Sequence, residues 1–325
     1  MHEFQAISIL GGGTIAFVVA WMFAAGLIPS PHAEPNARSL HTRPVPRIGG
    51  VAIWAGWLVA WMGVSISWQW AVPLALVVTV SLIDDYRALP ATVRLLAHAA
   101  AAILAVVTFV DAGWLFLAFA VLAVVWMANL YNFMDGADGL AGSMGLFGFG
   151  AYAVAAAVAG RAESGVLFGT LAAACAGFLV FNRPPARLFM GDVGAVGLGF
   201  LAGLFGLQGI VVGVWPWWFP PLVFAPFILD ATATLLRRLR QRAPLASAHR
   251  DHFYQRAILV DGTHGPTVRA YVGWMAGCAI LALAGLTWAP AAGGLLLLAA
   301  GAGFAWHCRA IEQRWSVWRR VQHAG

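Results

Sequence analysis

The chain has 325 residues, of which 61% are hydrophobic and only 10% are charged, and its formal net charge at pH 7 is +6. Soluble domains carry about 25% charged residues, so this composition argues against a water-soluble fold. The positive charge does not indicate a nucleic-acid partner, because the basic residues are spread over short loops and form no basic domain. The three cysteines, Cys175, Cys278 and Cys308, lack metal-site or disulfide-framework spacing and are expected to pack.

Apolar segments long enough to cross a bilayer as helices recur along the chain. We expect one integral membrane domain over 1–325, an all-α polytopic transmembrane bundle of about eleven spans, or about ten if a short segment does not cross. The first segment is too long for a signal-peptide core and lacks a basic start, so we expect it to stay as an anchor. The expected spans are 4–28, 48–67, 70–84, 94–110, 114–131, 138–159, 164–181, 194–207, 209–236, 268–288 and 291–308.

The distribution of arginine indicates the orientation of these spans. All 19 basic residues are Arg, and with a periplasmic N-terminus every one except Arg161 falls on the cytoplasmic side. Basic residues accumulate in short cytoplasmic loops, so we expect this orientation. Most acidic residues fall on the same side, which places the active face in the cytoplasm. Its loops are expected near 29–47, 84–94, 129–138, 182–193 and 237–267.

A stiff basic loop precedes the second span. It holds Arg38, Arg43 and Arg47 among three prolines and leads into the pair Gly49 and Gly50. Such a loop suits an anionic ligand held against the membrane. It suits a positive-inside anchor equally well, and this segment alone does not decide between them.

Two adjacent carboxylates, Asp84 and Asp85, end the third span. Adjacent helical side chains point about 100° apart, so the pair is expected to divide two roles and not to form one chelate. Burying two carboxylates at a membrane boundary is costly unless a cation or donor meets them. This cost favours a functional pair over a solvated helix end.

Two further polar clusters follow the fifth and seventh spans. Asn132, Asp135 and Asp138 are three residues apart and would share one face of a helical turn, although Asp138 could merely cap the next helix. Asn182 opens a later loop in which Phe189 offers a ring for a base to stack on and Asp192 a hard oxygen ligand. Interfacial packing is the alternative for Phe189.

The last cluster is a histidine motif after a run of arginines. His249 and His252 flank Arg250, and together they are expected to bind a phosphate, since no further ligands of suitable spacing indicate zinc. We expect the upstream Asp230 to offset the arginines. His98 is expected to be a histidine that packs between helices.

These clusters, in this order, resemble the polyprenyl-phosphate N-acetylhexosamine-1-phosphate transferase superfamily, glycosyltransferase family 4. The most specific motifs are 132–141, Asn-Phe-Met-Asp-Gly-Ala-Asp-Gly-Leu-Ala, and 189–192, Phe-Met-Gly-Asp. The resemblance implies transfer of a sugar-1-phosphate from a UDP-sugar to undecaprenyl phosphate in the bacterial inner membrane, with release of UMP. It also implies Mg²⁺, which Mn²⁺ could replace, and is compatible with a homodimer.

The resemblance also implies individual roles. Asp192 resembles the metal ligand, Asp84 and Asp85 the pair near the metal and the lipid phosphate, and Arg43 a contact on the uridine side. Asn132, Asp135, Asp138 and Asn182 resemble the polar lining of the nucleotide-sugar site, with Asp135 counted among the catalytic residues. Phe189 resembles the uracil-stacking ring, and His249 and His252 the ends of the family's histidine motif.

One departure refines the resemblance. Asp251 stands where several branches have a further His, and the form His-Arg-Asp-His resembles enzymes that start O-antigen or other surface polysaccharides. The competing class is a transporter of a charged lipid or sugar. Transporters place ionisable groups near the bilayer midplane, often in repeated halves, whereas these carboxylates gather at one face and no internal repeat is seen.

Overall fold

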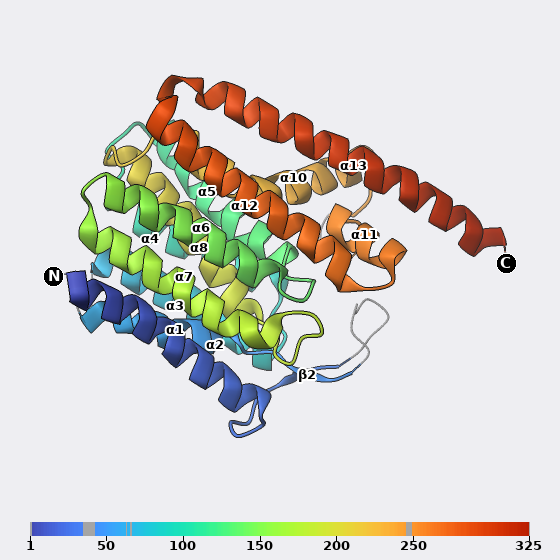
Figure 1. Cartoon of the computed structure of the whole chain (residues 1–325), viewed down its shortest axis with the longest axis horizontal. Coiled ribbons are helices and arrows are strands. Elements are labelled where there is room, and N and C mark those ends of the chain that lie inside the picture. Colours follow the sequence, from blue (N-terminus) through green and yellow to red (C-terminus); the bar gives the residue numbers. More distant parts are fainter. Residues whose placement is uncertain (1, 35–42, 63, 66, 245–248, 325) are drawn as a thin grey trace.

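The computed structural model describes residues 2–34, 43–62, 64–65, 67–244 and 249–324. The expected all-α polytopic bundle is confirmed over these residues, and the only strands among them are the short antiparallel pair β1 and β2 (Figure 1). Arg38, which belongs to the expected basic loop, lies outside the described residues. The elements are α1 (His2–Ala24), β1 (His32–Ala33), β2 (Val45–Pro46), α2 (Gly50–Trp57), η1 (Leu58–Met62), α3 (Trp68–Tyr86), α4 (Ala91–Val106), α5 (Trp114–Phe133), α6 (Leu140–Val158), α7 (Ala162–Asn182), α8 (Asp192–Val211), α9 (Phe219–Val223), α10 (Ala225–Arg240), α11 (Phe253–Asp261), α12 (His264–Trp288), η2 (Pro290–Ala292) and α13 (Gly293–Ala324).

Seven of the described helices are long and apolar enough to cross a bilayer, and the shorter apolar segments Gly50–Met62 and Ala91–Val106 accompany them. Helices suit this environment because their backbone hydrogen bonds are satisfied within each segment, where hydrocarbon offers no partner. The count of about eleven spans and the orientation of the bundle stay predictions.

The expected span over 209–236 is wrong as a continuous helix. Helix α8 continues to Val211, a turn follows at Gly213, and the chain resumes as the five-residue α9 and then as α10. Proline lacks a backbone N–H and clashes with the preceding turn of a helix. Pro216, Pro220, Pro221 and Pro226 therefore divide an apolar stretch that hydropathy reads as one span.

Helix α8 lies in the middle of the bundle, packed against α3 on one side and α5 on the other. Glycine makes this approach close, because a Cβ added at Gly199 would lie 2.5 Å from the Met127 carbonyl oxygen of α5. Small residues at helix contacts are the usual way for membrane helices to pack. The N-terminus of α8 is thereby held beside the C-termini of α3 and α5.

The polar loops meet at one end of the bundle. The α5–α6 and α7–α8 connections, β2 and α11 all lie towards this end (Figure 1). Helix α13 extends past it, beyond the expected end of its span at residue 308. The five polar clusters of the sequence are thus gathered in space.

Candidate active site

The centre of the site is the junction between the end of α3 and the start of α8. The Asp85 carboxylate, 0% exposed, accepts hydrogen bonds from the backbone N–H groups of Asp192 at 3.0 Å and Val193 at 2.9 Å. The first N–H groups of a helix lack partners within the helix. Asp85 therefore caps α8 from another helix, and its third donor is the Arg47 guanidinium at 2.7 Å.

Arg94 joins the other two carboxylates of this junction. Its Nη1 lies 2.8 Å from an Asp84 oxygen and 3.2 Å from an Asp192 oxygen. The Asn132 amide is 3.4 Å from the same Asp192 oxygen, and the Leu89 backbone N–H donates to Asp84 at 2.6 Å. Asp192 thus faces a positive charge and an amide donor from two different helices.

The acidic junction fits a magnesium ion that substrate would help to hold. Over the part of the chain that the structure describes, no three His, Cys, Asp or Glu side chains are arranged around one metal position. Mg²⁺ typically uses only one or two protein carboxylates and completes its shell with phosphates and water. Asp192 and Asp84 both contact Nη1 of Arg94 and so lie close together, which makes them the residues that would hold the ion.

A cavity of about 340 Å³ opens beside Asp192. Burial and the nearby carboxylates of Asp192 and Asp85 raise the pKa of the Asp135 carboxyl well above its ordinary value. The cavity brings together most of the residues expected at the nucleotide-sugar site and adds others. From the expected set it is lined by Asn132, Asp135, Asp138, Asn182, Phe189 and Asp192.

Asn182 contributes to this cavity mainly by holding its loops. The side chain is 3% exposed; its oxygen accepts the Gly139 N–H at 2.9 Å, and its amide donates to the Leu188 carbonyl at 2.9 Å. Gly139 has a φ of +79°, a conformation that favours glycine. Both polar groups of Asn182 are therefore occupied by backbone.

Asp138 joins the α5–α6 loop to the start of α12. One of its oxygens accepts the Ala186 N–H at 3.0 Å, and the other lies 3.1 Å from Nδ1 of His264. A second cavity of about 670 Å³ adjoins this pair and is also lined by Arg43 and Phe189. Phe189 thus lines one cavity with Arg43 and another with Asp192.

A third cavity, of about 400 Å³, is also lined by Asp192. It shares Asn132, Phe133, Asp192 and Gln255 with the first cavity. His249 and His252 line it, with their rings stacked at 5.2 Å between centroids, whereas Arg250 lies outside the linings of these three cavities. Burial and the charges of His252 and Arg238 lower the pKa of His249 to about 4, so its imidazole is neutral at pH 7.

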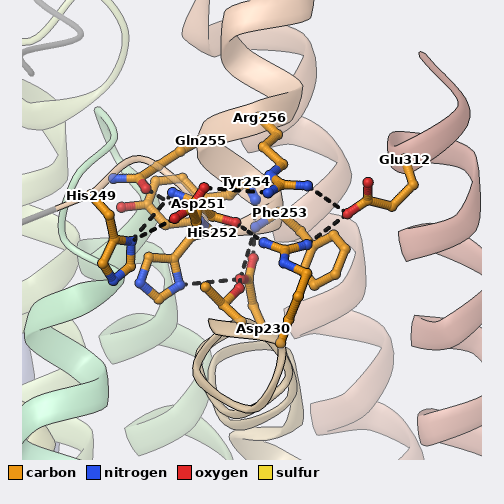
Figure 2. Close-up of polar contacts among 11 residues, drawn as sticks. Asp230, His249, Asp251, His252, Phe253, Tyr254, Gln255, Arg256 and Glu312 are labelled. Atoms are coloured by element: carbon orange, nitrogen blue, oxygen red, sulfur yellow. Dashed lines mark hydrogen bonds and ion pairs between the residues drawn. The ribbon is translucent and has the colours of Figure 1, made fainter. Parts of the chain in front are cut away.

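Asp230 does more than the expected offset of the arginine run, because it also caps α11. The carboxylate is fully buried and accepts the backbone N–H groups of Phe253 and Tyr254, both at 3.0 Å (Figure 2). The Tyr271 hydroxyl also donates to it, and Nδ1 of His252 lies 3.3 Å away. Asp230 therefore fixes both the start of α11 and the His252 ring.

The arginines that follow Asp230 pair with other acids. Arg238 and Arg256 both bond the Asp251 carboxylate, and Arg237 and Arg256 reach Glu312 of α13 at 2.6 and 2.7 Å (Figure 2). Burial alone would raise the pKa of Asp251, but these arginine contacts outweigh it and lower the pKa. The histidine motif is thereby fastened to the C-terminal helix.

Sequence reasoning missed several residues of the site. Arg94 and Gln255 belong to none of the clusters singled out in the sequence. His264 carries no local motif, and its pairing with Asp138 spans 126 residues. Polar lining residues that the sequence did not assign to the site include Ser81, Arg94, His98, Gln255 and His264.

Comparison with known proteins agrees with this geometry. The family model described as glycosyl transferase family 4 matches residues 67–210. This range includes the acidic junction and the motifs at 132–141 and 189–192. Over these residues the chain is similar to glycosyl transferase family 4. The matched segment does not include Arg43 or the histidine motif.

Individual relatives are similar to this chain over different lengths. A probable undecaprenyl-phosphate N-acetylglucosaminyl 1-phosphate transferase of Bacillus subtilis is 26% identical over 256 residues, 72% of each chain. Phospho-N-acetylmuramoyl-pentapeptide-transferases of Chloroflexus aggregans and Desulfotalea psychrophila are 32% and 31% identical over 39% of this chain. These two alignments span 34% and 38% of those relatives.

Proposed function

We propose that this protein transfers an N-acetylhexosamine-type sugar-1-phosphate from a UDP-sugar to undecaprenyl phosphate and releases UMP. One observation carries the proposal: Asn132 and Asp192 line two different cavities at once. A diphosphate in one cavity and a phosphate in the other would meet at these two side chains. The names of the relatives support the same class of reaction.

The donor would occupy the cavities on the Phe189 side. Phe189 lies between Arg43 in one lining and Asp192 in the other, so a base stacked on its ring would leave the diphosphate directed towards Asp192. Aromatic rings accept nucleobases on their faces, and arginine suits phosphate and uridine oxygens. The sugar would lie near Asp135 and Asp138.

The transfer needs charge stabilisation more than covalent help. An oxygen of the acceptor phosphate attacks the phosphorus that carries the sugar, the bond to the bridging oxygen breaks, and UMP leaves with that oxygen. Bound Mg²⁺ would neutralise charge on the phosphates. Arg94 and Arg47 supply fixed positive charge beside Asp192, and Asp135 can accept a proton if the acceptor phosphate carries one.

Direct attack fits the environment of Asp85 better than an aspartyl intermediate there. The two oxygens of Asp85 accept three hydrogen bonds, two of which cap α8. A covalent bond at either oxygen would break contacts that position Asp192. Asp85 therefore supports the site through its position, and the acceptor phosphate serves as the nucleophile.

The motif 249–252, His-Arg-Asp-His, supports a place at the first membrane step of O-antigen or another surface polysaccharide in a bacterial inner membrane. Its aspartate is the residue that pairs with Arg238 and Arg256.

The test is a purified full-length protein with undecaprenyl phosphate, Mg²⁺ and a panel of UDP-N-acetylhexosamines. We expect UMP release with one or a few of these sugars and a matching sugar diphospholipid by mass spectrometry. Proteoliposomes loaded with labelled substrate provide the opposing test. Substrate flux without UMP release would favour the transporter alternative and overturn the enzymatic proposal.

A further inference from the structure

Two buried side chains that line the 400 Å³ cavity each have one polar atom without a hydrogen-bond partner among the described residues. Ser81 on α3 is 2% exposed and His98 on α4 is 4% exposed. Within the part of the chain that the structure describes, neither Oγ of Ser81 nor Nδ1 of His98 has a hydrogen-bond partner, although both residues line this cavity. A buried polar group without a partner is unfavourable, so two in one cavity point to a polar ligand.

Their positions relate them to the acidic junction. Ser81 precedes Asp84 by three residues on α3, and His98 follows Arg94 by four residues on α4. Residues at these spacings lie on the same helix face, about one turn or 5 Å apart along the axis. Ser81 and His98 therefore lie one turn further along α3 and α4 from the end of the bundle, beneath the residues that contact Asp192.

The cavity also has an apolar, exposed side. Leu95, 51% exposed, and Phe133, 39% exposed, belong to its lining together with Val196. A ligand that contacts both parts must combine an apolar chain with a polar group that forms hydrogen bonds, and a phosphate also suits the nearby Arg94. Hydrocarbon alone would leave the Ser81 hydroxyl and the His98 nitrogen unpaired, and the nucleotide has its own cavities beyond Asp192.

We propose that Ser81 and His98 bind the phosphate of the polyprenyl phosphate acceptor. The hydroxyl of Ser81 and Nδ1–H of His98 donate to phosphate oxygens that do not attack, while Arg94 meets the phosphate from the side of Asp192. The prenyl chain leaves past Leu95. This inference rests on the proposed function and adds two acceptor-binding residues, one of which the sequence pattern assigned to packing.

Binding can be tested without turnover, on full-length protein in detergent, with farnesyl phosphate as the probe. Ser81→Ala and His98→Leu remove the donors, while His98→Asn keeps an amide nitrogen near the position of Nδ1. Each charge-assisted hydrogen bond lost should weaken farnesyl phosphate binding about ten-fold. Farnesol and UMP should bind the variants as they bind wild type, and His98→Asn should restore much of the affinity.

Thr170 provides the matched control. Its hydroxyl is also fully buried and has no hydrogen-bond partner among the residues described, but it lies on α7 against Gly12 of α1. Thr170→Val should leave farnesyl phosphate affinity unchanged. If His98→Leu does not fold, Ser81→Ala and His98→Asn still decide the assignment.

Other outcomes would overturn the proposal. One is an unchanged affinity for farnesyl phosphate in Ser81→Ala and His98→Leu. Another is a loss of farnesol affinity in these variants equal to their loss of farnesyl phosphate affinity. The third is inorganic phosphate that binds wild type as tightly as farnesyl phosphate does. In the turnover assay, the KM for undecaprenyl phosphate should rise about ten-fold while the KM for the UDP-sugar stays constant. Wild type that releases no UMP with any UDP-sugar would defeat the proposed function, whereas the farnesyl phosphate measurements would still test Ser81 and His98 by themselves.

Discussion

The Asp85 carboxylate accepts the backbone N–H of Asp192 at 3.0 Å, so the last turn of α3 holds the first residue of α8. Asp85 and Asp192 look alike in the sequence, but the structure gives them different surroundings. Asp85 is fully enclosed, whereas the Asp192 side chain is 18% exposed and faces two cavities. Substitution of each should therefore affect different properties.

Asp85→Asn should destabilise the protein. The amide keeps the shape but replaces one acceptor oxygen with a donor, which leaves an N–H of α8 or the Arg47 guanidinium unpaired. Loss of such buried contacts costs about 3 kcal/mol, and the melting temperature in detergent should fall by several degrees. Thermal unfolding monitored by intrinsic fluorescence measures this.

Asp192→Asn should show the opposite pattern, with a melting temperature close to that of wild type and almost no turnover across a Mg²⁺ titration. The Asp192 carboxylate contacts Arg94 and Asn132 at the cavity surface. The substitution therefore removes a negative charge from the site and leaves the packing of the core unchanged. Turnover within a few-fold of wild type would contradict its assignment as the metal ligand.

Cysteine labelling tests the orientation of the bundle. Glu34→Cys and Gln241→Cys place exposed thiols in the 29–47 and 237–267 loops at the end that carries the site. Both should react with an impermeant maleimide only from the cytoplasmic side. Asp111→Cys and Glu163→Cys, exposed in connections predicted to be periplasmic, should react only from outside. The reverse pattern would place the site on the wrong side for cytoplasmic UDP-sugars.

The sequence was sufficient where a signal is local. Apolar runs predicted most helices, and the spacing of Asn132, Asp135 and Asp138 predicted a shared lining that the structure shows. The break after α8 also has a local signal, Pro216 and Pro220 within the apolar stretch, but the expected span over 209–236 did not use it. Average hydropathy concealed it, because proline in an apolar segment lowers the mean very little.

Contacts between distant segments could not be predicted. Asp230 caps a helix that begins 23 residues later, and no sequence pattern near Asp230 indicates that its carboxylate accepts the N–H of Phe253. His98 looked like a packing residue because its neighbours on α4 are apolar. Only the fold shows that its ring lines the same cavity as Asp192.

His249 should reduce stability in mild acid. Its pKa is about 4 in the folded protein and about 6.5 as an ordinary histidine, so between these values the unfolded chain binds a proton that the folded chain does not. Stability must therefore fall as the pH decreases through this window. His249→Gln should lose less melting temperature than wild type between pH 7.5 and pH 5. Identical losses would show that His249 is protonated in the folded state.

Phe189 is expected to stack on the base of the UDP-sugar. Its backbone is fixed independently of its ring, since its N–H donates to the Pro46 carbonyl and its carbonyl accepts the Gly49 N–H, both at 2.8 Å. A substitution should therefore change the ring and leave the loop in place. Phe189→Leu keeps an apolar side chain but removes the aromatic face, and stacking of one base is worth about 1–3 kcal/mol.

We accordingly expect Phe189→Leu to bind UDP about ten- to a hundred-fold more weakly in a calorimetric titration. The variant should retain the wild-type KM for undecaprenyl phosphate, because the ring lines only the two cavities on the donor side. Phe189→Tyr is the matched control and should bind UDP nearly as wild type does. Equal UDP affinity for the Leu and Tyr variants would instead support the packing interpretation, in which the ring only covers the loop between Pro46 and Gly49.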